Sequence, residues 1–310
     1  SASLIGRLDF SGGAEGVWVR TPVRPSVKGA PTPLVAATPD VFDVLGTQRW
    51  ARVSEPNTSG SCNQGIAEYP DGTPCAAHTY AYVDFHPGSD SFVLLGSASP
   101  YGLGGGGAPT VHLFSFDTNS WRRGADRPGD SGYEGATSAY DPNRDAFWVL
   151  PAYGQRFAKY EPAANGGAGK WTMYSQATIT IDGASAVDPV HDLFVTVDAR
   201  GTQRVIVRDL KNPGAAPVTV TTSGATAPQS SEKLGFEWDS VGQTFVSWIG
   251  GTSVYTLAAP SGDWRTGTWV WRQITAAAAN TVTPTSPNEN GTYSKFRYMP
   301  SVNAFIVYNR

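Results

Sequence analysis

The stretch HPGSDSFVLLG, at residues 86–96, contains the pattern that decides the fold: a short turn that leads to a Phe and an apolar run. The pattern recurs in DPNRDAFWVLP (141–151), DPVHDLFVTVD (188–198), DSVGQTFVSWI (239–249) and MPSVNAFIVYN (299–309). The repeated Phe residues are Phe92, Phe147, Phe194, Phe245 and Phe305. The position five residues earlier holds Pro87, Pro142, Pro189, Ser240 and Pro300. A pattern that returns about every fifty residues indicates an architecture built from repeats.

Each copy predicts one strand before the turn and one after it. The segments before the turn are HTYAYVDF, GATSAYD, GASAVD, LGFEWD and KFRYM. Their small and aromatic residues suit an inner strand that packs near a crowded axis. The runs after the turn, such as FVLLG and FWVLP, are almost wholly apolar, which is typical of a strand covered on both faces.

A second pattern follows each of the first four copies and predicts two further strands. The segments are VHLFSFDTNSW (111–121), QRFAKYEPAANGGAGKW (155–171), RVIVRDLKNPGAAPVTV (204–220) and SVYTLAAPSGDWRTGTWVW (253–271). Trp121, Trp171 and Trp271 lie in the last strand, Trp50 matches them upstream, and Val218 takes this place in the third copy.

One repeat is therefore a unit of four antiparallel strands, which leaves both faces exposed when it stands alone. Stacking such units in a ring buries the faces and protects the edges. We therefore predict one all-β domain over residues 1–310, a β-propeller with kelch-like four-stranded blades. A β-sandwich with short strands would not need the Pro, the Phe and the later Trp to recur in step.

The number of blades is open between five and six. The last copy, Lys295 to Asn309, lacks a third and fourth strand. The segment VFDVLGTQRWARV, at residues 41–53, is a candidate for both strands and would close the ring between the two ends of the chain. Residues 1–38 contain LIGRLDF and GVWVR, so they form either a degenerate sixth blade or an extension.

Composition excludes several classes of partner. The net charge is −3, from 23 basic and 26 acidic residues, and no basic stripe stands out. We therefore do not expect a nucleic-acid partner. No apolar run approaches the roughly 18 residues that a membrane span needs, so we expect no span. The chain begins SASLIGRLDF, without Met, and we expect it to be a mature or trimmed chain.

Cys62 and Cys75 are the two cysteines, and they lie in a loop rich in Gly, Asn and Pro. We predict a disulfide between them, which would place the protein in an oxidising compartment: secreted, periplasmic or at the cell surface. Two free thiols in a cytosolic protein are the alternative.

The chain resembles secreted bacterial kelch-like β-propellers over roughly residues 48 to 310. The resemblance rests on DGTPCAAHTYAYVDFHPGSDSFVLLGS, FSFDTNSW and NGTYSKFRYMPSVNAFIVYN. This group includes propeller polysaccharide lyases and sugar oxidases, so the resemblance implies a carbohydrate-active protein with a polysaccharide or glycan as its partner.

In a propeller, the residues at the entrances of the inner strands converge on one face, although they lie far apart in the sequence. These polar and aromatic positions are His78, Tyr80, Tyr133, Glu134, Asp182, Lys233, Tyr293, Lys295 and Arg297. We predict that they share one cavity, in which rings stack on a sugar and charged groups meet its carboxylates or hydroxyls.

The leading functional hypothesis is a lyase that acts on an acidic, uronate-containing polysaccharide. His78 and Tyr80 would be the base and acid of a β-elimination, and Arg297 or Lys295 would neutralise the substrate carboxylate. Tyr133, Glu134, Lys233 and Tyr293 would bind substrate. The simpler alternative is that His78 and Tyr80 fill the channel and bond to the backbone.

Other hypotheses stay open. Glycoside hydrolysis would need a pair of carboxylates from Glu134, Asp182 and Glu237. We expect no metal or other cofactor, because the four histidines, His78, His86, His112 and His191, fall in segments that do not meet. The second functional hypothesis is a non-catalytic propeller that binds a glycan or a protein, or a structural subunit of a surface assembly. The sequence leaves the oligomeric state open.

Overall fold

The computed structural model describes residues 4–9, 17–21, 68–75, 77–96, 109–129, 135–152, 156–176, 181–278, 280–287, 289–300 and 303–309. Trp50, Cys62, Tyr133, Glu134 and the segment 41–53 lie outside them. The pairing of Cys62 with Cys75 therefore stays a prediction, and Cys75 itself is buried.

The described part of the chain is all-β, in successive antiparallel sheets. The first sheet contains β3 (Val83–His86), β4 (Ser91–Leu94), β5 (His112–Ser115) and β6 (Ser120–Arg123). The second contains β7 (Thr137–Asp141), β8 (Ala146–Leu150), β9 (Arg156–Glu161) and β10 (Lys170–Gln176). The third contains β11 (Ala184–Asp188), β12 (Leu193–Asp198), β13 (Arg204–Asp209) and β14 (Val218–Val220).

The fourth and fifth sheets each carry a feature that the repeat does not predict. The fourth contains β16 (Gly235–Asp239), β17 (Thr244–Trp248), β18 (Val254–Ala258) and β19 (Trp269–Ile274). The short strand β15 (Thr222–Gly224) adds to it, parallel to β19. The fifth contains β20 (Phe296–Met299), β21 (Ala304–Asn309), β1 (Leu4–Asp9) and β2 (Val17–Thr21).

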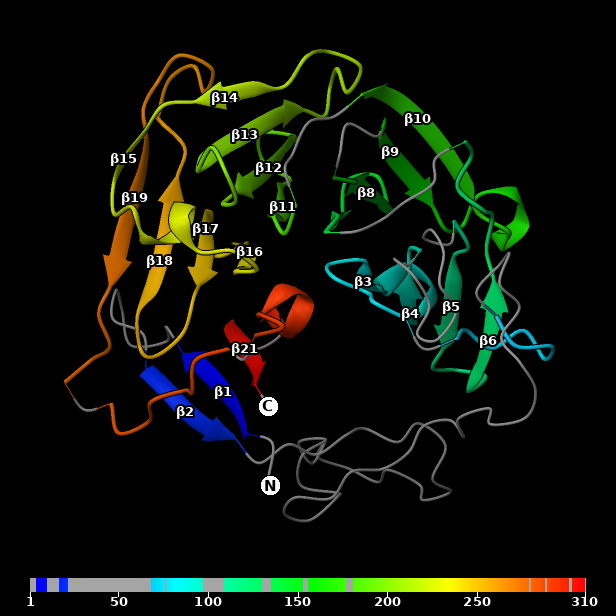
Figure 1. Cartoon of the computed structure of the whole chain (residues 1–310), viewed down its shortest axis with the longest axis horizontal. Helices are drawn as coiled ribbons and strands as arrows, with labels where there is room; N and C mark the ends of the chain where they lie inside the picture. Colours follow the sequence, from blue (N-terminus) through cyan, green and yellow to red (C-terminus); the bar gives the residue numbers. More distant parts are fainter. Residues whose placement is uncertain are drawn as a thin grey trace.

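The sheets lie around a common centre, the arrangement of a β-propeller (Figure 1). The strand before each turn lies towards the centre, and the fourth strand of each repeat lies at the periphery (Figure 1). Short 3-10 helices lie at Pro87–Ser89, Asn165–Gly167, Ala227–Ser230 and Tyr293–Lys295. Within the described residues, no helix has the length and apolar character that a membrane crossing requires.

The N-terminal segment corrects one expectation about the last repeat. The structure places Leu4–Asp9 beside β21 as the third strand of the fifth sheet, and Val17–Thr21 as the fourth. These described strands take the two places that we expected residues 41–53 to take. The segments LIGRLDF and GVWVR also do not form a sheet of their own, because they complete the sheet that the C-terminal copy begins.

The repeated Phe keeps the same register in every sheet. In each case it pairs with the residue seven positions earlier, on the inner strand of its own sheet, as in Tyr140 with Phe147 and Trp238 with Phe245. Phe147, Phe194, Phe245 and Phe305 are fully buried, whereas Phe92 is half-buried. The repeated Phe is therefore a core residue in four of the sheets, and it is only partly buried in the first sheet.

In every repeat, one residue of the turn has a left-handed backbone conformation. Two residues before the repeated Phe, the turns hold Asp90, Asp145, Asp192, Gln243 and Asn303 with positive φ. Most of these are Asp or Asn, the residues that tolerate this conformation best after Gly. Asp141, Asp188 and Asp239 stabilise three of the turns, because their carboxylates accept backbone N–H groups two residues later at 2.9 Å.

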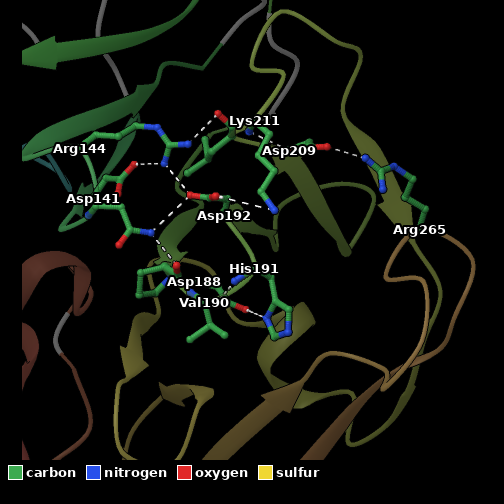
Figure 2. Close-up of polar contacts among 12 residues, drawn as sticks. Asp141, Arg144, Asp188, Val190, His191, Asp192, Asp209, Lys211 and Arg265 are labelled. Atoms are coloured by element: carbon green, nitrogen blue, oxygen red, sulfur yellow. Dashed lines mark hydrogen bonds and ion pairs between the residues drawn. The ribbon is translucent and has the colours of Figure 1, made fainter.

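Ion pairs join the turns of neighbouring sheets. The Arg144 guanidinium of the second sheet lies 2.9 Å from the Asp141 carboxylate in its own turn and 2.7 Å from Asp192 in the third sheet (Figure 2). Farther out, Arg265 of the fourth sheet lies 2.6 Å from Asp209 of the third. Polar side chains therefore connect successive sheets on the face that carries the turns.

Candidate functional site

The inner strands bring one residue from each sheet to the centre of the molecule. These residues stand eight positions before the repeated Phe, and we call them the axial set: Asp84, Ala139, Ala186, Glu237 and Arg297. Because side chains alternate along a strand, equivalent positions on inner strands face the same way. All five residues line one cavity of about 570 Å³, the axial cavity.

Two carboxylates of the axial set contact its third charged member, Arg297. Arg297 Nη1 lies 2.9 Å from Glu237 Oε1 and 3.2 Å from Asp84 Oδ1. Arg297 Nη2 donates to the carbonyl of Val83, and Nε donates to the carbonyl of Ser294 at 3.2 Å. Each guanidinium nitrogen therefore already has an acceptor, and the contacts connect the fifth sheet to both the fourth and the first.

Burial changes the titration of this cluster. It raises the pKa of the Glu237 carboxyl to about 7, although the charge of Arg297 acts in the opposite direction. Burial also acts to lower the pKa of Arg297, but the charges of Asp84 and Glu237 outweigh it and raise this pKa. Arg297 therefore stays charged, while Glu237 changes its charge near neutral pH.

The two small members of the axial set explain where the space in the cavity comes from. Ala139 and Ala186 stand where the other sheets carry Asp84, Glu237 and Arg297. A methyl group fills far less volume than those side chains. The cavity is therefore asymmetric, with charged groups from the first, fourth and fifth sheets and only methyl groups from the axial positions of the second and third.

Aromatic side chains also line the cavity. The position seven residues before the repeated Phe carries the rim set, all of which line the cavity: Phe85, Tyr140, Val187, Trp238 and Tyr298. Pro87, Pro142, Pro189, Ser240 and Pro300 also line it. The mouth therefore opens on the face that carries the turns, and Phe85 is 46% exposed there.

Hydrogen bonds at the turns hold two of the rim rings. Tyr140 Oη donates to Asp145 Oδ1 at 2.7 Å, and Tyr298 Oη donates to Asn303 Oδ1 at 2.9 Å. The acceptors are equivalent turn residues in the second and fifth sheets. These rings are therefore held in place without a ligand, which lowers the entropy that binding would cost.

The other end of the inner strands carries the entrance set, which stands twelve positions before the repeated Phe. It consists of Tyr80, Gly135, Asp182, Lys233 and Tyr293, all with positive φ. Backbone hydrogen bonds link its members: Asp182 donates to the Gly135 carbonyl and Lys233 to the Asp182 carbonyl, both at 3.1 Å. A Cβ at Gly135 would lie 1.9 Å from Ile181 Cγ1, so only glycine fits there.

The structure brings several sequence-predicted site residues together at the entrance set. The ring centroids of His78 and Tyr80 lie 6.0 Å apart. The rings of Tyr80 and Tyr293 meet edge to face, with their centroids 5.6 Å apart. Tyr293 Oη donates to Asp182 Oδ1 at 2.5 Å, and Arg200 lies 3.3 Å from the other oxygen of Asp182. Burial, followed by the bond to Asp182, raises the pKa of Tyr293.

The two predicted lysines contact backbone carbonyls near the entrance set. Lys233 Nζ donates to the carbonyl of Glu289, and Lys295 Nζ donates to that of Gly291, each at 3.0 Å. Lys233 also lines a second cavity of about 410 Å³, between the fourth and fifth sheets, together with Glu232 and Thr292. The two lysines therefore do not reach the axial cavity.

Arg297 is the predicted site residue that the structure places elsewhere, in the axial cavity. Glu237 was expected only as a possible hydrolase carboxylate, and neither Asp84 nor the rim set was expected at the site. The sequence does contain a signal for these charged residues, because aligning the copies on the repeated Phe puts Asp84, Glu237 and Arg297 at one position. The roles of His78, Tyr80 and the other predicted residues stay predictions.

No family model matches the chain, and no curated protein does. Among solved structures it is similar to an auxiliary nutrient binding protein from Bacteroides thetaiotaomicron (12% identity, TM-score 0.44, 73% of this chain and 50% of that chain). It is also similar to a copper-complexed fungal alcohol oxidase of the AA5 family (11%, 0.43, 70% and 45%) and to the Swd1 β-propeller domain from Myceliophteria thermophila (12%, 0.42, 73% and 61%).

The chain spans roughly half the length of these structures, between 45% and 61%. Similarity at this level carries no information about function.

Proposed function

We propose that the protein is a non-catalytic, glycan-binding β-propeller whose binding site is the axial cavity. The observation that carries this proposal is the rim set over a charged floor: Phe85, Tyr140, Trp238 and Tyr298 line the same cavity of about 570 Å³ as the charged members of the axial set. This volume lies within the usual range for small-ligand sites, which combine apolar walls with a few polar groups.

The chemistry of the wall suits a sugar ring. Aromatic faces pack against the C–H groups of a sugar, and fixed polar groups meet its hydroxyls. Phe85 and Trp238 provide such faces, while the Glu237 carboxyl, with its pKa near 7, is able to donate or accept a hydrogen bond. The residues of the axial cavity therefore favour binding of a sugar unit over its cleavage.

A uronate lyase is the second candidate, because His78, Tyr80 and Tyr293 cluster at the entrance set. Two observations weigh against it. Arg297 already donates from all its nitrogens to protein acceptors, so it is not free to neutralise a substrate carboxylate. Tyr293, which was expected to bind substrate, already donates its hydroxyl group to Asp182.

A paired assay separates the two functions. Immobilised neutral and acidic oligosaccharides test binding, and the ultraviolet absorbance of an unsaturated uronate product tests elimination. We expect binding without new absorbance. Phe85→Ala should weaken binding at least about tenfold, because its ring faces the mouth, with little change in stability. Binding that is lost in His78→Ala and kept in Phe85→Ala would move the site to the entrance set.

We also infer that the five sheets form a closed five-bladed ring. Two observations support this: the fifth sheet combines the two ends of the chain, and Arg297 of β20 contacts Asp84 of β3 in the first sheet. A secreted or cell-surface location would fit a glycan ligand and the predicted Cys62–Cys75 disulfide. Titration of thiols in the native, non-reduced protein tests that disulfide.

A further inference from the structure

We propose that the axial cavity selects a glycan that carries an organic cation, either a quaternary ammonium or a protonated alkyl amine. The geometry that points to this ligand is the combination of aromatic rings at the rim with one more carboxylate than cations at the floor. This inference rests on the proposed glycan-binding function and names the chemical class of its ligand.

The charge of the floor follows from the side chains that line the cavity. Of the described lining residues, Asp84, Glu237 and Arg297 carry formal charges. Asp84 and Glu237 share a single nitrogen, Arg297 Nη1. One guanidinium therefore faces two carboxylates, and the floor has a net charge of −1 when Glu237 is ionised.

The arginine does not offer its charge to a ligand. Its side chain is 32% exposed, but its nitrogens donate to Glu237, Asp84, Val83 and Ser294. Arg297 contacts Glu237 through Oε1, and Glu237 lines the cavity, so we assign Oε2 as the carboxylate oxygen that meets the ligand. An anionic sugar would meet repulsion here, whereas a cation would meet an acceptor.

The rim adds a second attraction for a cation. The faces of Trp, Tyr and Phe attract ammonium groups, and aromatic surroundings are a common way to recognise quaternary ammonium ligands. Tyr140 and Tyr298 are held by their hydroxyl groups, so the two rings are fixed in advance. The space beside Ala139 and Ala186 leaves room for the uncharged remainder of the ligand.

Choline and its neutral carbon isostere, dimethylbutanol, test this inference because they share shape and differ in charge. Binding to the full chain is measured by calorimetry at about pH 8, where Glu237 is mostly ionised. We expect choline to bind at least about tenfold more tightly than the isostere. Equal affinities, or no detectable binding of choline, would overturn the inference.

A matched pair of variants locates the charge. Glu237→Gln removes the carboxylate from the cavity and should bring choline close to the isostere. Glu232→Gln makes the same change near the entrance set and should leave the difference intact. An equal loss in both variants would contradict the inference. If neutral oligosaccharides bind but choline is not preferred over its isostere, the inferred selectivity for a cation is wrong and the proposed function stands. If neither glycans nor choline bind, the proposed function is wrong as well.

Discussion

The repeated Phe positions and the axial set are equivalent across the sheets, yet they behave differently. The repeated Phe positions carry the same residue in every copy, and four of the five side chains are fully buried. The axial set carries Asp84, Ala139, Ala186, Glu237 and Arg297. A position that every copy uses for packing stays uniform, whereas a position that faces the shared axis is free to differ. The departures from the repeat therefore mark the site.

The largest expected effect on stability comes from truncating the repeated Phe residues. Phe194→Ala and Phe245→Ala should each lower the free energy of unfolding by roughly 3–5 kcal/mol, because each removes a fully buried ring. Phe92→Ala should cost less, since Phe92 is half-buried. Urea unfolding of the three variants measures the difference. An equal cost at all three positions would mean that the first sheet packs like the others.

A smaller effect should follow from removing the one cation of the axial set. Arg297→Met leaves Asp84 and Glu237 facing each other without a counter-charge and should destabilise the protein by about 2–3 kcal/mol at pH 8. Arg265→Met is the control, because its pair with Asp209 lies at the surface, where such pairs contribute at most about 1 kcal/mol. Similar losses in thermal or urea unfolding would show that Arg297 does not join the first and last sheets.

The dependence of stability on pH sharpens the account of Glu237. Burial raises its pKa in the folded state to about 7 from 4.5, so between these values the folded protein binds more protons than the unfolded chain. Stability should therefore fall as the pH rises through this window, by about 1–3 kcal/mol. The charged groups that face Glu237 are Arg297 on β20 and Asp84 on β3.

Glu237→Gln should remove this part of the pH dependence, because glutamine does not titrate. Urea unfolding of both proteins at several pH values between about 5 and 8 measures it. A slope that is unchanged in Glu237→Gln would assign the titration to another group. The control Glu232→Gln should keep the slope of the parent protein.

Much of the fold was predictable because it depends on local patterns. The turn residues, the apolar runs after them and the recurring Phe identify four-stranded units, and the predicted inner strands agree with β3, β7, β11, β16 and β20. The completion of the fifth sheet was less accessible. Both Leu4–Asp9 and residues 41–53 read as candidate strands, and pairing between distant segments leaves no local signal.

The candidate site was predictable only in part. Tyr80, Asp182, Lys233 and Tyr293 do converge, since each stands twelve residues before the repeated Phe. Polar residues at strand entrances are easy to recognise. In contrast, Asp84 and Glu237 lie within short strands, where a charged residue looks like an ordinary solvent-facing position. Aligning the copies on the repeated Phe puts both residues at the position of Arg297, and the structure shows that their carboxylates contact its guanidinium.

The central claim is that the axial cavity binds the ligand, and filling the cavity tests it most directly. Ala186→Phe places a ring at an axial-set position that lines the cavity, and Ala278→Phe makes the same change at an exposed position. Calorimetric titration with an oligosaccharide that binds in the immobilised-sugar assay compares both variants with the parent protein, after thermal unfolding has shown that each is folded. The account predicts that Ala186→Phe loses binding by at least about a hundredfold while Ala278→Phe binds like the parent. Unchanged affinity in a folded Ala186→Phe protein would contradict it.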